Sequence, residues 1–340
     1  MKRVMIVTNS LSGGGAERSM NLLSNELTKR GWPVSLVPIN SSIADQVVVV
    51  SEVFSLDRKW NSSFVNTIIA LWKFNKVVRV WQPDVIVLNC DLPELFGALL
   101  LGKHNLVALE HASQPWKQRK LLGKLVRKIL SFRKIRWAAV STHLTIWPSK
   151  EKPITVLQNS VLLPIEHKLR VTDSEIKRLA FIGRLSQEKR PDLALEIAKL
   201  TKLELVVIGD GLMKEVLESK ALHESINATF LGWVKDPWSE ILAGDLLIVT
   251  SSFEGDGLIV IEGLAHGVPI LLAGISDLRR FNFPEKHYCN TLDGFVATIA
   301  DFENRLGELV VENDVTKVIL EERLISKVGD EWIKFLEASS

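Results

Sequence analysis

The sequence predicts an α/β fold of two Rossmann-like, doubly wound domains that face each other across a cleft. Short apolar runs rich in valine and isoleucine recur along the 340 residues. Each run is followed by a longer segment of helical period, a pattern typical of parallel strands covered by helices on both faces. There are eleven such runs. One open sheet usually holds fewer strands than that, so we predict two sheets.

Six strands are predicted in the N-terminal domain and five in the C-terminal domain. The first set is residues 3–9, 34–39, 84–90, 105–111, 137–141 and 154–160. The second set is residues 178–184, 204–211, 228–233, 245–252 and 268–274. Ligands of open α/β sheets bind outside the carboxyl ends of the strands, so we expect substrates between the two sheets.

The junction between the domains is predicted within residues 158–167, which lack a helical period. The formal charge changes sign there. Residues 1–165 carry 22 Lys/Arg and 10 Asp/Glu, a balance of +12, and the remainder carries 20 and 30, a balance of −10. We assign residues 1–163 to the first domain and 164–324 to the second. This asymmetry suggests an anionic partner for the basic half.

Several classes of protein are not expected. No uninterrupted apolar run reaches 18 residues, so no membrane-spanning helix is predicted. The first apolar stretch is too short for a signal peptide and is broken by polar residues. Cys90 and Cys289 lack metal-type spacing. They suit a reducing cytoplasm and predict neither a disulfide framework nor a metal site.

Two loops at strand ends could bind anions. Glycines 13–15 stand between the first strand and a helix beginning near Ala16, and free amides at such a helix start favour an anion. The loop matches neither the dinucleotide nor the Walker pattern, and a simple tight turn is the alternative. Arg184 and Lys189 lie in a second loop. They could clamp a diphosphate without a metal, or they could be solvated surface cations.

The stretch "SSFEGDGLIVIEGLAHGVPIL", residues 251–271, contains two glutamates among glycines and aliphatic residues. Glu254 is predicted in a loop and Glu262 in the first turns of a helix. Ionised carboxylates only accept hydrogen bonds, so they suit the hydroxyls of ribose or a hexose. One of them could instead complement a helix dipole. His111 ends a strand of the first domain, where a lone histidine is commonly structural.

Residues 116–137 carry nine Lys/Arg and no acid. This pattern predicts a surface that binds an anionic membrane. The alternative is an ordinary helix with a solvated basic face. Nucleic acid is not expected, because no recognition motif for it is present. The apolar stripe of the predicted helix is Leu121, Leu122, Leu125, Ile129 and Leu130.

Together these motifs resemble the retaining GT-B glycosyltransferases of family 4, over nearly the whole chain. Glu254 and Glu262 are similar to the E-x7-E motif of that family, and "GRLSQEKRPDLAL" resembles its loop for the donor diphosphate. "VVIGDG" and "FLGW" resemble the next two segments around the nucleotide. "SGGGAER" is similar to the N-terminal glycine loop, and "LEH" to the histidine-bearing strand end.

The resemblance implies a role for each matching residue. Arg184 and Lys189 would neutralise the diphosphate, Glu254 would hold the donor sugar, and His111 would contact that sugar near the reacting carbon. These four form the expected catalytic set. The expected substrate-binding residues are Gly14, Gly15, Gly183, Gly209, Asp210, Gly211, Gly232, Trp233, Gly255, Asp256, Gly257, Leu258 and Glu262.

The resemblance also implies an activity: transfer of a hexose from a nucleotide-sugar, expected to be a UDP-sugar, with retention of configuration. The acceptor would be a polyprenyl-diphosphate-linked glycan of bacterial surface polysaccharide synthesis. No metal or cofactor is expected, and the enzyme would bind the inner face of the plasma membrane peripherally. The final helix, within residues 325–340, would return to the first domain.

Two departures from the family pattern and two alternatives accompany this prediction. Asp256 stands where the family often has an aromatic residue, which leaves the donor sugar open. Residues 41–80 match no family segment, and acceptor specificity is expected near them. The alternatives are a GT-B nucleotide-sugar epimerase or hydrolase, and a non-catalytic membrane-binding subunit.

Overall fold

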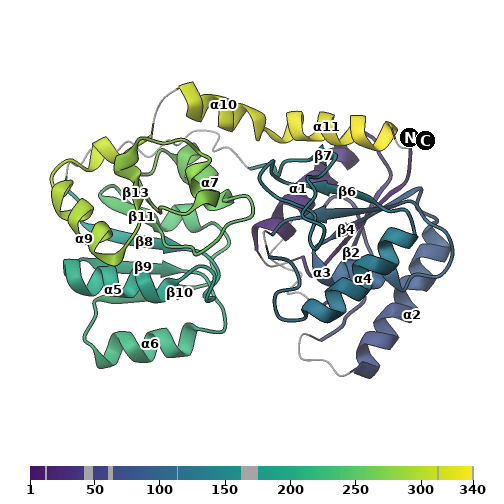
Figure 1. The fold of residues 1–340 in the computed structure, drawn as a ribbon, viewed down its shortest axis with the longest axis horizontal. Coiled ribbons are helices and arrows are strands. Elements are labelled where there is room, and N and C mark those ends of the chain that lie inside the picture. Colours follow the sequence, from purple (N-terminus) through teal and green to yellow (C-terminus); the bar gives the residue numbers. More distant parts are fainter. Residues whose placement is uncertain are drawn as a thin grey trace. The chain divides into compact units, whose positions relative to one another are not determined.

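The computed structural model describes residues 1–11, 14–41, 49–59, 64–112, 114–161, 175–311 and 314–338. The chain forms two compact units, each an α/β structure (Figure 1). Unit 1 is Met1–Val161 with Arg323–Ser340, and unit 2 is Leu162–Glu322. The predicted boundary after residue 163 lies outside the described residues, as does Gly13 of the predicted glycine loop.

Unit 1 contains a seven-stranded parallel sheet in the order β3-β2-β1-β4-β5-β6-β7. Each predicted strand is present, somewhat shorter than expected. Only the two-residue edge strand β3 was not predicted, because it has no apolar run. The strands are β1 Val4–Thr8, β2 Val34–Pro38, β3 Glu52–Val53, β4 Val85–Asn89, β5 Leu106–Glu110, β6 Arg136–Ala139 and β7 Thr155–Val156.

Helices cover both faces of this sheet, because successive residues of a strand point to opposite sides. Val4 and Ile6 of β1 pack in one core with α1 (Gly15–Lys29) and α11 (Ile325–Glu337). The residues between and after them pack in a second core. Its helices are α2 (Phe64–Trp81), α3 (Asp91–Ala98) and α4 (Lys120–Phe132).

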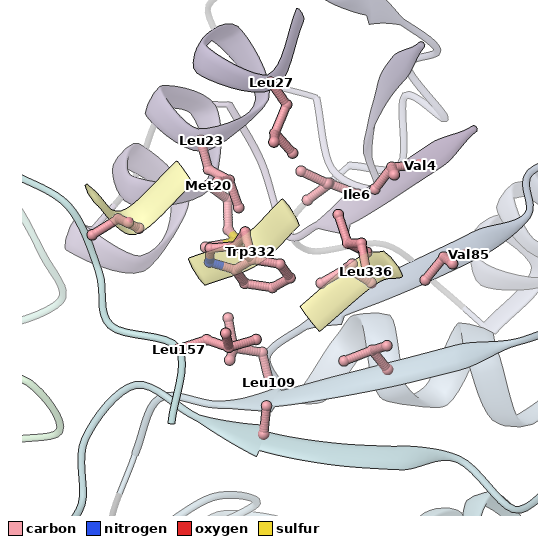
Figure 2. Close-up of a cluster of buried hydrophobic side chains, with 14 of the residues drawn as sticks. Val4, Ile6, Met20, Leu23, Leu27, Val85, Leu109, Leu157, Trp332 and Leu336 are labelled. Atoms are coloured by element: carbon pink, nitrogen blue, oxygen red, sulfur yellow. The ribbon is translucent and has the colours of Figure 1, made fainter. Parts of the chain in front are cut away.

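The helix α11 is tied into unit 1 by its apolar side chains. Trp332 and Leu336 lie among Met20, Leu23 and Leu109 (Figure 2). The indole of Trp332 is 1% exposed, so nearly all of its surface is removed from water. Burial of this extent stabilises the docking of α11 by roughly 2–3 kcal/mol for this side chain alone.

Unit 2 contains a six-stranded parallel sheet in the order β10-β9-β8-β11-β12-β13. The order reverses between β8 and β11, and such switch points are where ligands of open sheets bind. The two-residue edge strand β13 was not predicted. The strands are β8 Arg178–Ile182, β9 Glu204–Ile208, β10 Ala228–Gly232, β11 Asp245–Val249, β12 Ile270–Ala273 and β13 Tyr288–Cys289.

The helices of unit 2 connect these strands. They are α5 Pro191–Thr201, α6 Lys214–His223, α7 Leu258–His266, α8 Ser276–Arg279, α9 Leu292–Asp301 and α10 Asp314–Glu322, with short 3-10 turns η2 Pro237–Glu240, η3 Glu285–His287 and η4 Leu306–Leu309. The loops before α5 and α7 follow the two strands that flank the switch point. Among the described helices of both units, none is long and apolar enough to cross a membrane.

Candidate functional site

The loops that follow β8 and β11 are joined through their backbones. The amide of Ser252 donates to the carbonyl of Glu188 at 2.8 Å, and the hydroxyl of Thr250 donates to the carbonyls of Lys189 and Arg190 at 2.9 and 2.8 Å. These bonds fix the two loops to one another at the switch point. They bring together Lys189 and Glu254, which are 65 residues apart in the sequence.

Lys189 and Glu254 form a close ion pair. The Lys189 Nζ lies 2.5 Å from the Glu254 Oε1, and the Ser251 hydroxyl donates to the same oxygen at 2.7 Å. The Glu254 side chain is 6% exposed, and that of Lys189 is 29% exposed. A buried carboxylate needs such partners, because leaving its charge unpaired is costly. Sequence reasoning predicted both residues but not this pairing, nor the contribution of Ser251.

Lys189 keeps donors for a ligand, since an ammonium has three N–H groups and the Glu254 contact uses one. Arg184 is exposed, and its side chain has no hydrogen bond or ion pair with any residue in the described ranges. The loop therefore combines one cation held in place by a carboxylate with one that is exposed at the surface. Gly183, at the start of the loop, is bonded to β9 through its amide.

Gly209 and Gly211 have a packing role. Gly209 has a φ of 141°, and a Cβ added there would lie 1.9 Å from the carbonyl oxygen of Gly183. A Cβ at Gly211 would lie 2.4 Å from the carbonyl oxygen of Leu185. The loops after β8 and β9 thus pack backbone against backbone. Asp210, between these glycines, is exposed and accepts a bond from the amide that follows it.

The predicted residues after β10 lie at the same carboxyl edge. The carbonyl of Gly232 accepts a bond from the amide of Gly209 at 2.7 Å, which ties this loop to the one after β9. The Trp233 side chain is 41% exposed, an unusual degree for a large aromatic group.

The helix α7 begins without a side-chain cap. Its N-cap, Gly257, has a left-handed φ of 61°, and a Cβ there would lie 3.0 Å from the Phe281 ring. Leu258 is the first helical residue, and Gly255 lies in the preceding loop. The first amides of a helix have no intrahelical partners, so this turn can bind an anion near Lys189.

Asp256 is buried and held by an arginine. The Arg280 guanidinium donates to the carbonyl oxygen of Asp256 and lies 3.4 Å from its Oδ1. The amide of Glu254 donates to the Asp277 carboxylate at 2.9 Å. Both partners come from α8 and the residue after it, a segment that sequence reasoning did not connect with the site. The local sequence around Asp277 and Arg280 does not show that these side chains contact the loop before α7.

Glu262 lies on α7 and is 6% exposed. The indole N–H of Trp238 donates to its Oε2 at 3.4 Å, and the Trp238 ring stacks on His266 with centroids 4.8 Å apart. Burial lowers the pKa of His266, against an opposing effect of the nearby Asp236 charge. Trp238 was not predicted as a site residue. Its only sequence signal is a tryptophan in the connection that precedes β11.

Gly14, Gly15 and His111 belong to unit 1. Gly14 is the N-cap of α1, and Gly15 begins that helix. The first turn also contains Glu17, which is 6% exposed and accepts a bond from the Asn9 amide group at 3.4 Å. A carboxylate already stands at this helix start, which disfavours a phosphate there. His111 is half-buried and directly follows β5.

The prediction that Arg127 is part of an exposed basic face is wrong. Its side chain is 3% exposed and lies 2.6 Å from a Glu94 oxygen and 2.7 Å from a Glu110 oxygen. Burial, opposed by Arg127 and reinforced by Glu94, raises the pKa of Glu110 to about 7. An arginine stands on the buried face of α4 because it meets two buried carboxylates. Charge periodicity cannot reveal such partners.

The predicted apolar stripe of residues 116–137 is only partly buried. Leu130 is buried and Leu122 and Ile129 are half-buried, but Leu121 and Leu125 are 84% and 56% exposed. The buried positions of α4 are Gly123, Val126, Arg127 and Leu130. The solvent face of α4 therefore combines exposed leucines with exposed lysines.

Metal ligands do not gather in the described part of the chain: no group of three or more His, Cys, Asp or Glu is placed to hold an ion. The side chains gathered in unit 2 can bind a ligand through charge and hydrogen bonds. The site combines two cations, a free helix start and two buried carboxylates at the switch point of a parallel sheet. These are elements suited to a ligand that has both phosphates and hydroxyls.

Two protein-family models match the sequence of this chain. One, "Glycosyltransferase Family 4", covers residues 13–151, and the other, "Glycosyl transferases group 1", covers residues 166–287. The chain belongs to these glycosyltransferases. The second match spans the loops that hold Lys189 and Glu254, and the first spans most of unit 1.

This glycosyltransferase is similar to relatives of comparable length. It is 24% identical to an uncharacterized glycosyltransferase of Haemophilus influenzae, over 98% of this chain and 99% of that protein. It is also 24% identical to a Campylobacter jejuni enzyme, over 78% of this chain and 77% of that one. The latter is named a GalNAc-α-(1→4)-GalNAc-α-(1→3)-diNAcBac-PP-undecaprenol α-1,4-N-acetyl-D-galactosaminyltransferase.

A solved structure with the same fold is that of the Anabaena protein Alr3699/HepE, in complex with UDP and glucose. The TM-score is 0.77 at 14% identity, with 99% of this chain and all of that chain covered. The shared fold is GT-B, which confirms the predicted fold class. The prediction of a glycosyltransferase is confirmed as well.

Proposed function

We propose that the chain is a retaining glycosyltransferase that moves a hexose-type sugar from a UDP-sugar to a polyprenyl-diphosphate-linked glycan, in the synthesis of bacterial surface polysaccharide or glycan. The ion pair of Lys189 with buried Glu254, beside the uncapped start of α7, carries the proposal. A fixed cation and free amides would bind the diphosphate, and buried carboxylates would bind hydroxyls.

The donor would lie along the switch point of unit 2. Arg184 and Lys189 would neutralise the diphosphate, and the amides of Gly257 and Leu258 would donate hydrogen bonds to the phosphate. Glu262 would accept bonds from the ribose hydroxyls. Glu254 would hold the sugar. Trp233 and the loops after β9 and β10 would surround the base. UDP in the HepE structure supports uridine as the base, because that protein shares this fold.

The chemistry proposed is a front-face displacement. A bond forms between the acceptor oxygen and the anomeric carbon, while the bond from that carbon to the diphosphate oxygen breaks. The acceptor proton passes to the departing phosphate. Positive groups fixed where negative charge develops lower the barrier to such a step. His111 of unit 1 would contact the sugar near the reacting carbon, and Gly14 and Gly15 would approach donor and acceptor.

The lipid-linked acceptor is supported by the C. jejuni relative, whose name includes an undecaprenyl-diphosphate-linked glycan. It is also supported by the exposed face of α4. Lys120, Lys124 and Lys128 are exposed there beside Leu121 and Leu125. Each cation near an anionic membrane adds about 1 kcal/mol of attraction. We place the enzyme peripherally on the inner face of the plasma membrane.

A transfer assay tests the proposal. UDP-sugars are supplied with a membrane-lipid extract containing polyprenyl-diphosphate glycans, and product is followed by mass spectrometry, with the new anomeric configuration read by NMR. Sugar-dependent extension of the lipid with retained configuration is expected. Turnover of donor equally fast without any acceptor would favour the epimerase or hydrolase alternative. Donor binding without transfer to any acceptor would favour the non-catalytic subunit.

The charged face has its own test. The substitutions Lys124→Glu and Lys128→Glu together should release the enzyme from anionic vesicles, most clearly at low salt, because exposed charges are screened as salt rises. The matched control reverses Lys202 and Lys235, two exposed lysines of unit 2. Vesicle binding that ignores both salt and the α4 substitutions would contradict this part of the proposal.

A further inference from the structure

The helix α2 has two apolar faces, only one of which is buried. Its buried side chains, Ala70, Phe74, Val78 and Trp81, pack in the second core of unit 1. The other face carries large apolar groups in contact with solvent. They are Phe64, 80% exposed, Val65, 60%, Ile68, 50%, Ile69, 47%, and Trp72, 65%.

The spacing of these groups places them on one side of the helix. They recur at intervals of three and four residues, which brings side chains onto a common face. Isolated exposed apolar residues are normal, but a contiguous patch of this kind marks a site of interaction. Tryptophan suits the boundary between an apolar phase and water, because its ring is apolar and its N–H is polar.

Charge distinguishes the two halves of α2. The helix carries Lys73, Lys76 and Arg79 and no acidic residue. Lys76 is exposed, with its Nζ 5.7 Å from the centroid of the Trp72 ring, and Arg79 is exposed. Lys73 is half-buried and donates to the carbonyl of Leu56. The N-terminal half of the exposed side is apolar, and the C-terminal half carries the cations together with Val80, which is 74% exposed.

The helices α2 and α4 belong to the same layer of unit 1. Side chains of both pack in one core against the same face of the sheet, and both helices are visible in that layer (Figure 1). Arg58, shortly before α2, has its pKa lowered by burial and by the positive charge of Arg119, the N-cap of α4. The Arg58 guanidinium also donates to the hydroxyl of Thr67 in α2 at 3.0 Å, so this part of α2 and the start of α4 have a neighbour in common.

We propose that the face of α2 formed by Phe64, Val65, Ile68, Ile69 and Trp72 inserts into the apolar boundary of a lipid bilayer, while the cations of α2 and α4 contact anionic headgroups. This inference rests on the proposed membrane association and adds to it a contribution that salt does not screen. A helix with an apolar face, a basic flank and no acid is typical of segments that lie in the plane of a membrane interface.

Charge favours a membrane over a second copy of the chain as the partner. Two copies joined through this face would bring Lys76 and Arg79 to an interface where α2 supplies no carboxylate to pair with them. An anionic bilayer supplies both an apolar interior and negative headgroups. Lysine and arginine can extend their charged ends to the headgroups while their stems remain among apolar groups.

The test is vesicle co-sedimentation of the full chain, at low and high salt, with phosphatidylcholine alone or mixed with phosphatidylglycerol. The variant Ile68→Glu/Ile69→Glu places charge on the exposed face of α2 without altering the buried one. The control, Val216→Glu/Leu222→Glu, changes two apolar residues of α6 in unit 2 that are more exposed than Ile68 and Ile69, at 68% and 84%. Transition temperatures of both variants verify folding.

Wild-type protein is expected to retain binding to mixed vesicles at high salt. The α2 variant should lose that salt-resistant part, with partitioning at least about tenfold weaker, because a glutamate replaces an apolar group that would leave water. The α6 control should match wild type. A fluorescent label at Ile68→Cys should be quenched by nitroxide lipids, whereas one at Leu222→Cys should not.

Two results would overturn the inference. If the α2 variant binds vesicles as wild type does while the α4 charge variant does not, insertion of α2 is excluded and charge-driven membrane association stands. If wild type sediments as a dimer without lipid and the α2 variant as a monomer, the face joins two copies instead. UDP binding, which the proposal places in unit 2, should be equal in all variants, so failure of the donor-site proposal is seen separately.

Discussion

At the scale of single residues, Lys189 and Glu254 stabilise each other in addition to their proposed contacts with the donor. The carboxylate keeps the ammonium at the switch point, and the ammonium and the Ser251 hydroxyl make a buried carboxylate tolerable. Lys199 and Glu224 form a pair of similar length, 2.9 Å, at the surface of unit 2. Exposed ion pairs contribute little to stability. The Lys199–Glu224 pair therefore serves as a control for effects that come from losing a lysine–glutamate contact alone.

Lys189→Ala should lower turnover by about 10²–10³-fold, because the departing diphosphate loses a fixed positive partner. Lys189→Arg should restore part of that loss, and the control Lys199→Ala should leave turnover unchanged. The measurement is the steady-state rate at saturating UDP-sugar, with thermal unfolding recorded in parallel to identify any loss of folded protein. Turnover in Lys189→Ala equal to wild type would remove Lys189 from the site.

Glu110 makes stability depend on pH. Its pKa in the folded state is raised from 4.5 to about 7, so the folded protein binds a proton that the unfolded chain releases. That contribution is complete below pH about 4.5 and is lost as pH rises through about 7. In Glu110→Gln, the amide oxygen can still accept a hydrogen bond from Arg127, but the side chain no longer ionises. Between pH 5 and 8, wild type should lose roughly 2–3 kcal/mol of stability relative to the variant, a fall of several degrees in Tm. Parallel pH curves would contradict this assignment.

At the scale of elements, the strands were predictable and several side-chain faces were not. Continuous apolar runs such as residues 85–89 are typical of strands buried on both sides, and each of the eleven predicted runs overlaps a strand. The helix α4 shows the limit of this reasoning. Its buried Arg127 depends on Glu94 and Glu110, which belong to other elements, and a local pattern cannot show that. The apolar residues of α2 surround the helix, so the exposed face could not be separated from the buried one.

The docking of α11 supports a prediction about stability. Trp332→Ala removes a side chain that is 1% exposed and lies among Met20, Leu23 and Leu109. Such truncations usually cost about 3–5 kcal/mol. The control Phe132→Ala removes an aromatic ring that is 77% exposed and should cost far less. Urea unfolding with amide hydrogen exchange would locate the loss in unit 1, and equal stability of the two variants would contradict the packing account.

At the scale of the whole molecule, the chain combines an electrostatic site in one α/β unit with a basic, partly apolar surface on the other. The fold and the family followed from motif order. Of the predicted donor-site residues, the structure joins Lys189 to Glu254 and buries Glu262, and it adds Trp238, Asp277 and Arg280. Those partners were invisible because their contacts depend on loop geometry, which periodicity does not encode.

The proposed mechanism without a metal gives a prediction for the complete enzyme. Because the proposed leaving-group stabilisation uses Arg184, Lys189 and helix amides, chelation with EDTA should leave sugar transfer unchanged. The measurement is transfer rate after EDTA treatment and desalting, with and without added Mg²⁺ or Mn²⁺. A loss of activity that either ion restores would contradict the metal-free mechanism.

The most direct test of the central claim is nucleotide binding to the proposed donor site of unit 2. UDP, GDP, ADP and their sugar conjugates are screened by thermal shift against wild type, Glu262→Ala and the surface control Lys199→Ala. A ligand at 100 times its Kd stabilises the folded state by about 2.7 kcal/mol. The account predicts a shift with UDP that the control retains and Glu262→Ala loses. No shift with any nucleotide, or an equal shift in Glu262→Ala, would contradict it.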